Sequence, residues 1–176
     1  LNIVRSKFEL KSVMIKNTTS DAFDSDFSQG TIENGVFENI GLNGEGDGID
    51  VSGSEIIVKE SYFKNISDKA LSVGENSYME ASGINIKDVS IGAASKDGSK
   101  LFIFDSKMRG VQKAGLMAYI KKTEYGPSEI TVEGLEYNST GKKAIVQNGS
   151  KIIVGGKEIQ SEDLNIKELY ATGEKP

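Results

Sequence analysis

Large apolar residues recur along the chain at a nearly constant spacing, in two columns that keep step with each other. The first column, with spacings of 22, 26, 23 and 22 residues, consists of Ile15, Phe37, Phe63, Ile86 and Met108. The second column, with spacings of 26, 22, 22, 23 and 29 residues, consists of Phe23, Ile49, Leu71, Ala93, Leu116 and Ile145. Self-similarity at a fixed period of about 20 to 50 residues is the signature of repeat architectures. The two columns therefore predict a chain of stacked repeats.

Within each repeat, apolar positions alternate with polar ones. In the second repeat, for example, Ile32, Val36, Phe37 and Ile40 lie in short segments that are separated by glycine and small polar residues. Segments this short and rich in Val, Ile, Phe and Thr are typical of strands rather than helices. They predict an all-β fold, a parallel β-helix (solenoid) of about seven coils, in which each coil pairs its backbone with the coils before and after it.

A column of polar residues follows the first apolar column at a distance of two residues. It consists of Asn17, Asn39, Asn65 and Asp88. Asparagine tolerates the left-handed backbone conformation that a sharp bend needs. Stacked amides can also hydrogen-bond along the stack. We therefore expect an asparagine ladder at one corner of the solenoid, with Asn17 and Asn65 pointing inward.

The pattern divides the chain into residues 1–160, the parallel β-helix, and residues 161–176, a C-terminal cap or tail. Ser161 is a candidate N-cap of a short helix in the tail. The apolar side of that helix would carry Leu164, Ile166, Leu169 and Tyr170. A solenoid needs closed ends, but Leu1–Leu10 already has the pattern of a strand and no cap precedes it. We expect the rest of a larger chain, or self-association with a second copy, to cover that end.

The composition excludes several kinds of chemistry. The 176 residues include no His, Cys or Trp, and the formal net charge is −5. Ser-His-Asp and Cys-His triads, zinc sites with nitrogen or sulfur ligands, and disulfides are therefore excluded. Any metal would need oxygen ligands, which favours calcium or magnesium. The negative charge argues against a nucleic-acid partner, and no apolar run is long enough for insertion into a membrane.

Residues that flank the second apolar column point outward because side chains alternate along a strand. The first two repeats place five carboxylates on one face, namely Asp21, Asp24, Asp26, Asp47 and Asp50. The following repeats place cationic and phenolic groups further along the same face, namely Lys69, Lys96 and Tyr119. Glu75 and the long insertion 121–129, which carries Lys121 and Tyr125, lie nearby.

Asp24 is expected to lie directly above Asp50. Like charges on paired strands repel, so a cation, a raised pKa or nearby lysines must offset the repulsion. A Ca²⁺ ion could be held by a set of four carboxylates, Asp24, Asp26, Asp47 and Asp50. Alternatively, Asp24 and Asp50 could be an acid and a nucleophile or base at the separation of about 5 Å that retaining glycosidases use.

Two further interpretations of this face remain open. Lys96 and Tyr119 could serve as base and acid in proton abstraction from an acidic sugar. The remaining candidates for ligand contact are Asp26, Asp47, Lys69, Glu75, Lys121 and Tyr125. Lys69, Lys96 and Tyr119 are the residues expected to position an anionic sugar. The plainest interpretation is a solvated polar face that keeps the long side of the solenoid soluble.

Five segments resemble a bacterial family in the family's order. They are Ser20–Phe27 (SDAFDSDF), Gly46–Ser54 (GDGIDVSGS), Asp68–Asn76 (DKALSVGEN), Gly92–Ser99 (GAASKDGS) and Tyr119–Pro127 (YIKKTEYGP). The family is the right-handed parallel β-helix domain of the pectate-lyase-like superfamily found at the C-terminal end of CotH-type, cell-surface-associated proteins. The resemblance covers most of residues 1–160. It implies a right-handed β-helix with three sheets and an extracellular or cell-surface (extracytoplasmic) location.

The wider superfamily consists mostly of lyases, hydrolases and epimerases of acidic polysaccharides. The resemblance therefore implies that a polysaccharide or another cell-surface glycan lies along the Asp-rich face. The chain departs from the family because only the insertion 121–129 could form a cleft wall, and because Ile120 and Thr123 stand where the family has Gln and Pro. The rival hypothesis is a non-catalytic structural or assembly module, such as a stalk, a spacer or an adhesin-like domain of a larger surface protein.

Overall fold

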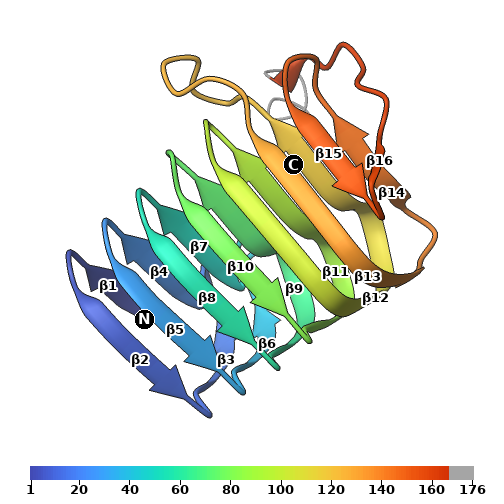
Figure 1. Cartoon of the computed structure of the whole chain (residues 1–176). Helices are drawn as coiled ribbons and strands as arrows, with labels where there is room; N and C mark the ends of the chain where they lie inside the picture. The colour runs from blue at the N-terminus through green and yellow to red at the C-terminus, as the bar shows by residue number, and fades with distance from the viewer. Residues whose placement is uncertain (167–176) are drawn as a thin grey trace.

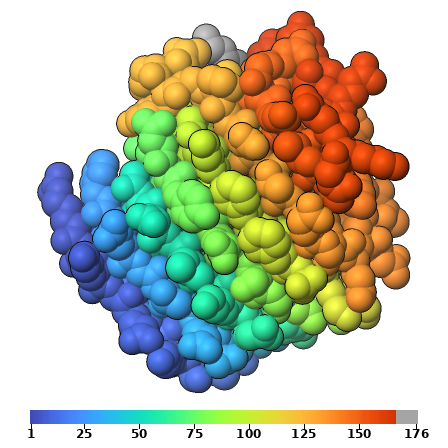
Figure 2. Space-filling view, viewed as in Figure 1, coloured from blue at the N-terminus to red at the C-terminus, as the bar shows by residue number. Residues whose placement is uncertain are grey.

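The computed structural model describes residues 1–166 and shows an all-β parallel solenoid of about seven turns (Figure 1). Each coil contributes strands to three faces. The coils run side by side as parallel bands from the N-terminus to the C-terminus (Figure 2). Among the described residues, no helix is long and apolar enough to cross a membrane.

Three parallel stacks of strands form the faces. The first face consists of β2 (Lys7–Lys11), β5 (Gln29–Glu33), β8 (Glu55–Lys59), β10 (Tyr78–Ser82), the first parts of β12 (Lys100–Tyr119) and β13 (Glu129–Asn138), and β15 (Lys151–Val154). The second face consists of β3 (Met14–Thr18), β6 (Val36–Ile40), the first parts of β9 (Tyr62–Gly74) and β11 (Asn85–Lys96), the middle of β12 and the end of β13. The third face consists of β1 (Asn2–Val4), β4 (Phe23–Asp26), β7 (Ile49–Ser52), the ends of β9, β11 and β12, and β14 (Lys142–Val146). A short last strand, β16 (Lys157–Glu158), pairs antiparallel with β15.

The first apolar column forms a single row inside the second face, as predicted. Its members pair in register from β3 through β12. All are fully buried except Ile15, which is half-buried in the first coil. Phe37 and Phe63 stack with their ring centroids 4.9 Å apart. Burial of this row contributes to the driving force for folding at roughly 25 cal/mol per Å² of apolar surface.

The second apolar column is confirmed from Phe23 to Leu116, but its last member is wrong. Phe23, Ile49, Leu71, Ala93 and Leu116 form one buried row. The next residue in that row is Ala144, because Leu116 pairs with Ala144 and Met117 pairs with Ile145. A shift of one residue moves a side chain to the opposite face of a strand. Ile145 therefore points outward, where Leu164 and Ile166 supply the apolar cover it needs.

The asparagine ladder exists, but its side chains lie on the outside. Asn17, Asn39, Asn65 and Asp88 all adopt the left-handed conformation, with φ between 53° and 58°. Asn39 Nδ2 donates to Asn17 Oδ1, and Asn65 Nδ2 donates to Asn39 Oδ1, both at 2.9 Å. Asn17 and Asn65 are exposed. The prediction that they point inward is wrong because apolar neighbours such as Phe37 and Ile40 fill the interior of the corner.

A buried serine ladder occupies the corner between the third and first faces. Each serine hydroxyl accepts a backbone N–H from the preceding coil at 3.0 or 3.1 Å, and the acceptors are Ser28, Ser54, Ser77, Ser99 and Ser150. Buried backbone donors at a bend have no strand partner and need another acceptor. The serines supply that acceptor.

The two ends of the described chain differ. At the N-terminal end Ile3, Phe8 and Leu10 are only partly buried. At the C-terminal end Glu162 forms a parallel β-bridge with Gln147. The segment expected to be the first helical turn is therefore extended. The tail packs on the outer side of the third face, and of the expected helix only Ile166 is helical within residues 1–166. Leu169 and Tyr170 lie outside the described residues.

Candidate functional site

The outer side of the third face changes character along the solenoid. Its central row is in the predicted register and consists of Asp24, Asp50, Ser72, Ala94 and Met117. The members from the first coils are polar and the last members are apolar. Leu164 and Ile166 pack on the apolar end of the face together with Tyr119. The part of the face that a ligand can reach is therefore the part formed by β4, β7 and the ends of β9 and β11.

Asp24 and Asp50 are direct neighbours in β4 and β7, as predicted. Together with Asp21 they bring three carboxylate oxygens within 4.8 Å of one another. Burial, together with the charges of Asp21 and Asp50, raises the pKa of Asp24 to about 6. Burial also raises the pKa of Asp50, and the neighbouring Lys96 ammonium group opposes that rise. The repulsion expected within this pair is thus offset by proton retention and by a lysine.

Lys96 reaches Asp50 from a coil further along the solenoid. Lys96 ends β11, Asp50 lies in β7, and β9 lies between them. The Lys96 side chain passes over Gly74, where a Cβ atom would lie 2.9 Å from Lys96 Cε. Its Nζ atom lies 3.7 Å from Asp50 Oδ1. The absence of a side chain at Gly74 therefore makes room for this ion pair.

A second group of charges is buried beside the first. Lys69 is 4% exposed and Asp47 is 6% exposed. Lys69 Nζ lies 3.3 Å from Asp47 Oδ1 and also contacts the Asp68 carboxylate. The Lys69 backbone N–H donates to the same Asp47 oxygen at 2.9 Å. Burial raises the pKa of Asp68 to about 6, against the opposing charge of Lys69. Asp47 and Lys69 therefore link two neighbouring coils, and their charged groups largely satisfy each other.

These two groups border one polar pocket of about 260 Å³. It is lined by Ser20, Asp21, Glu45, Gly46, Asp47, Asp50, Asp68, Lys69, Lys96 and Lys121. Five of these side chains are carboxyl groups and three are ammonium groups. Acceptors and donors of this kind suit the hydroxyl groups of a sugar. The excess of carboxyl groups favours a neutral or cationic ligand over the anionic sugar expected from the sequence.

The remaining predicted residues are spread around this pocket. Tyr119 lies beside Lys96 in register, but its side chain is fully buried in the apolar cluster under the tail, away from any ligand. Glu75 is paired with Lys122, at the base of the insertion. Tyr125 is half-buried in that insertion, and Tyr125, Asp24 and Asp26 do not line the pocket.

The insertion is anchored by a residue that the sequence analysis did not single out for this role. Asp97 is 1% exposed, and its Oδ1 accepts the backbone N–H groups of Lys121 and Lys122 at 2.7 and 2.6 Å. This places Lys121 at the pocket. Asp68 was also missed, although an acid directly before Lys69 in a strand-like segment is a signal that could have found it.

The set of residues that could hold a metal differs from the predicted one. Within residues 1–166 the carboxylates that come together are Asp21, Asp24 and Asp50, without Asp26 or Asp47. Ca²⁺ takes about six to eight oxygen ligands, so three carboxylates would need backbone or solvent oxygens in addition. The Lys96 ammonium group beside Asp50 competes with a cation at this position.

Comparisons with known proteins assign no family to this chain, so its class is defined by the fold. A scan against protein-family models finds no match, and a search of curated proteins finds no similar sequence. The structure defines the class as a parallel β-solenoid with a charged pocket on one outer face.

Proposed function

We propose that the exposed part of the third face binds a glycan, with the pocket beside Asp24 and Asp50 as the contact region. The observation that carries this proposal is the pair of adjacent carboxyl groups with raised pKa values, of which Asp50 lines a polar pocket and Asp24 lies beside it on the neighbouring strand. Carboxyl groups with shifted pKa values cluster at functional sites, because the chemistry of such sites needs pKa values matched to the task. The carboxylates can accept hydrogen bonds from sugar hydroxyl groups, and the ammonium groups can donate hydrogen bonds to them.

The pair also supports a catalytic proposal. Asp24, with a pKa of about 6, is partly protonated near neutral pH and could donate a proton to a leaving oxygen. Asp50, beside Lys96, would act as the nucleophile or base. Carboxyl oxygens within 4.8 Å of each other suit the separation of about 5 Å in retaining glycosidases. The reaction class we propose is therefore hydrolysis of a glycosidic bond.

The proposal extends to the family. We propose that the chain is a right-handed β-helix of the pectate-lyase-like kind that works outside the cytoplasm, on a surface protein of the CotH type. The parallel solenoid and the segments quoted above support it.

A panel of defined oligosaccharides tests the proposal. We would measure equilibrium binding, and release of reducing ends, with neutral, amino-sugar and uronate oligosaccharides. Asp24→Asn and Asp50→Asn should each weaken binding or abolish turnover. Asp105→Asn is the matched control, because it removes one negative charge from an exposed corner on another side of the solenoid. If no oligosaccharide of the panel binds, or if Asp50→Asn binds like the wild type, the proposal is wrong.

A structural module is the second candidate function, and one observation favours it. Several of the charged groups predicted as site residues are used in contacts that hold coils or the insertion in place, namely Asp47, Lys69 and Glu75. If the solenoid is only a stalk, Asp50→Asn relieves repulsion and raises stability, and no glycan binds. Stability and binding measured on the same variant therefore separate the two functions.

A further inference from the structure

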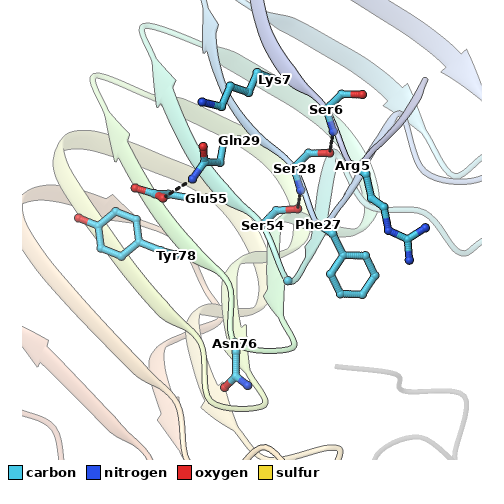
Figure 3. A pocket seen from close by; sticks show the side chains of 11 residues that line it. Arg5, Ser6, Lys7, Phe27, Ser28, Gln29, Ser54, Glu55, Asn76 and Tyr78 are labelled. Atoms are coloured by element: carbon cyan, nitrogen blue, oxygen red, sulfur yellow. Dashed lines mark hydrogen bonds between the residues drawn. The ribbon is translucent and has the colours of Figure 1, made fainter.

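A second hollow lies at the corner between the third and first faces, away from the pocket beside Asp50. Its volume is about 500 Å³, and Figure 3 shows its side chains. The lining residues that matter here are Arg5, Lys7, Phe27, Gln29, Glu55 and Tyr78. They come from β2, β5, β8 and β10 and from the turns that follow β1 and β4. None of them belongs to the Asp-rich site.

Phe27 is an unusual residue for this corner. Its backbone is left-handed, with φ of 51°, and its side chain is 57% exposed. The next two coils place Gly53 and Asn76 at the corresponding bend, which are residue types that accept this conformation. A bulky residue there costs both backbone strain and exposure of apolar surface. The preceding coil places Arg5 at the same bend, also with a left-handed backbone (φ of 47°), so two bulky residues in contact with each other bear this cost at the hollow.

The neighbouring coil makes room for the Phe27 ring. A Cβ atom at Gly53 would lie 2.6 Å from Phe27 Cδ1, so the ring occupies the space that a side chain at Gly53 would need. Figure 3 shows Tyr78 on the opposite side of the hollow. The Tyr78 ring is 37% exposed and rests on Phe102, with their ring centroids 5.4 Å apart. Two supported aromatic rings thus border the hollow.

Polar groups lie between the two rings. Gln29 Nε2 donates to Glu55 Oε2 at 3.1 Å, and this pair lies between Phe27 and Tyr78 in Figure 3. Gln29, Glu55 and Tyr78 follow Lys7 in one outward row of paired positions. Aromatic surface together with a few fixed hydrogen-bonding groups is the usual lining of a small-ligand site.

The charge of the hollow is opposite to that of the whole chain. The Arg5 guanidinium group lies over the Phe27 ring, with Cζ 5.5 Å from its centroid, and Lys7 lies on the adjoining strand. Within the part of the chain that the structure describes, neither cation forms an ion pair with an acid. Glu55 is the only acid that lines the hollow among these residues. The net charge of the chain is −5, so this is a local cationic site on an acidic protein.

We propose that this hollow is a second glycan-binding site that takes an anionic sugar, with the apolar face of the sugar ring on Phe27 or Tyr78 and its anionic group at Arg5 and Lys7. Axial C–H groups give one face of a sugar ring an apolar character that matches an aromatic ring. Arginine and lysine are the side chains that recognise carboxylate, sulfate and phosphate groups. The anionic preference distinguishes this site from the acidic pocket beside Asp50.

Binding of three probes tests the ligand chemistry. At low ionic strength a tetragalacturonate should bind, its methyl ester should bind at least about tenfold more weakly, and acetate alone should not bind measurably. A sulfated disaccharide distinguishes the source of the anion, because tighter binding of this probe would assign the site to sulfate rather than carboxylate. Equal binding of the ester, or equal binding of acetate, would overturn the proposal.

Variants test the location. Phe27→Asn suits the left-handed backbone, so we expect an unchanged or higher melting temperature together with binding that is about five- to tenfold weaker. Arg5→Gln should weaken binding similarly and reduce its dependence on salt. The matched controls are Leu42→Asn, an exposed apolar residue outside the hollow, and Lys59→Gln, an exposed lysine at the far end of β8.

Each outcome of the variant series has one meaning. If Phe27→Asn binds like the wild type, or if the controls weaken binding as much as Phe27→Asn does, the proposal is wrong. If Asp50→Asn alone abolishes binding of the uronate, the binding site is the Asp-rich face, and the proposed function survives without the second site. If Phe27→Asn and Arg5→Gln abolish binding while Asp50→Asn does not, the second site stands independently of the proposed function.

Discussion

Lys96 Nζ lies 3.7 Å from Asp50 Oδ1, although a complete coil of the solenoid separates the strands that carry these two residues. The contact depends on the glycine at position 74, which lies between the two residues. A Cβ atom there would lie 2.9 Å from Lys96 Cε and would displace the lysine side chain. The carboxyl group that the lysine approaches has a raised pKa and borders the charged pocket. This contact therefore opposes the rise in pKa that burial causes at Asp50, the residue that the proposed function depends on most.

Removing the ammonium group should raise the pKa of Asp50 further. In the variant Lys96→Met, burial of the Asp50 carboxyl group persists, but the charge that opposes its effect is lost. We expect the titration of Asp50, followed by carboxyl ¹³C NMR, to move to higher pH. Lys59→Met, at an exposed position of another face, is the control. An unchanged Asp50 titration in Lys96→Met would show that the ion pair does not exist in solution.

Gly74→Ala should have the same effect by a different route. The added methyl group meets the flexible Lys96 side chain, so the lysine must shift away from Asp50. We expect a rise in the pKa of Asp50 and a loss of about 1 kcal/mol in the free energy of unfolding, at the lower end of the range for overpacking. Chemical denaturation measures the stability. A variant that keeps both the wild-type Asp50 titration and the wild-type stability would contradict this geometry.

The free energy of unfolding should fall as the pH rises from about 4 to above 6. Asp24 and Asp68 have an ordinary value of 3.8 and a folded-state pKa of about 6, so the folded chain binds these protons more tightly than the unfolded chain. Their stabilisation is complete below pH 3.8 and is lost as the pH rises through about 6. The loss is on the order of 2 kcal/mol for the largely buried Asp68, and it is smaller for the half-buried Asp24 because solvent screens it.

Denaturation at several pH values measures this dependence. Glu38 acts in the opposite direction because Lys16 and Lys64 lower its pKa, but it acts only below its ordinary value of 4.5. Asp24→Asn should reduce the pH dependence of the free energy of unfolding by the contribution of Asp24. Stability that increases steadily from pH 4.5 to pH 8 would refute the assignment of raised pKa values to Asp24 and Asp68.

The asparagine ladder should contribute through both its backbone conformation and its amide bonds. Asn39→Ala loses the side-chain hydrogen bonds to Asn17 and Asn65. It also places alanine at φ of 58°, a left-handed conformation that alanine adopts only with strain. We expect a loss of about 1–2 kcal/mol in the free energy of unfolding. Asn39→Gly removes the same bonds without the conformational strain and should lose less. Equal losses in the two variants would show that strain plays no part.

The rows of the solenoid could be predicted from the sequence because the repeat itself sets the register. Once Phe23 and Ile49 are one coil apart, Asp24 must lie beside Asp50, and the structure has both pairs. The exchange of Ile145 for Ala144 in the buried row could not be predicted. It depends on Leu164 and Ile166 covering the outer face, and no period encodes that contact.

The candidate site was predictable only in part. The columns place Asp47 and Lys69 on one face, but they do not show that these side chains turn toward each other and become buried. Tyr119 has an outward position in its row, yet the tail covers it. Long side chains such as Lys96 reach across coils, and this reach depends on a neighbouring glycine that a pattern of apolar and polar positions does not reveal.

Carboxyl ¹³C NMR of Asp24 and Asp50 during titration, with and without the tightest-binding oligosaccharide of the panel, is the sharpest test of a glycan site at these two residues. We expect Asp24 to titrate near pH 6 in the free protein and both carboxyl signals to shift when the glycan binds. A titration of Asp24 near its ordinary value of 3.8, with both signals unmoved by every glycan, would contradict this expectation.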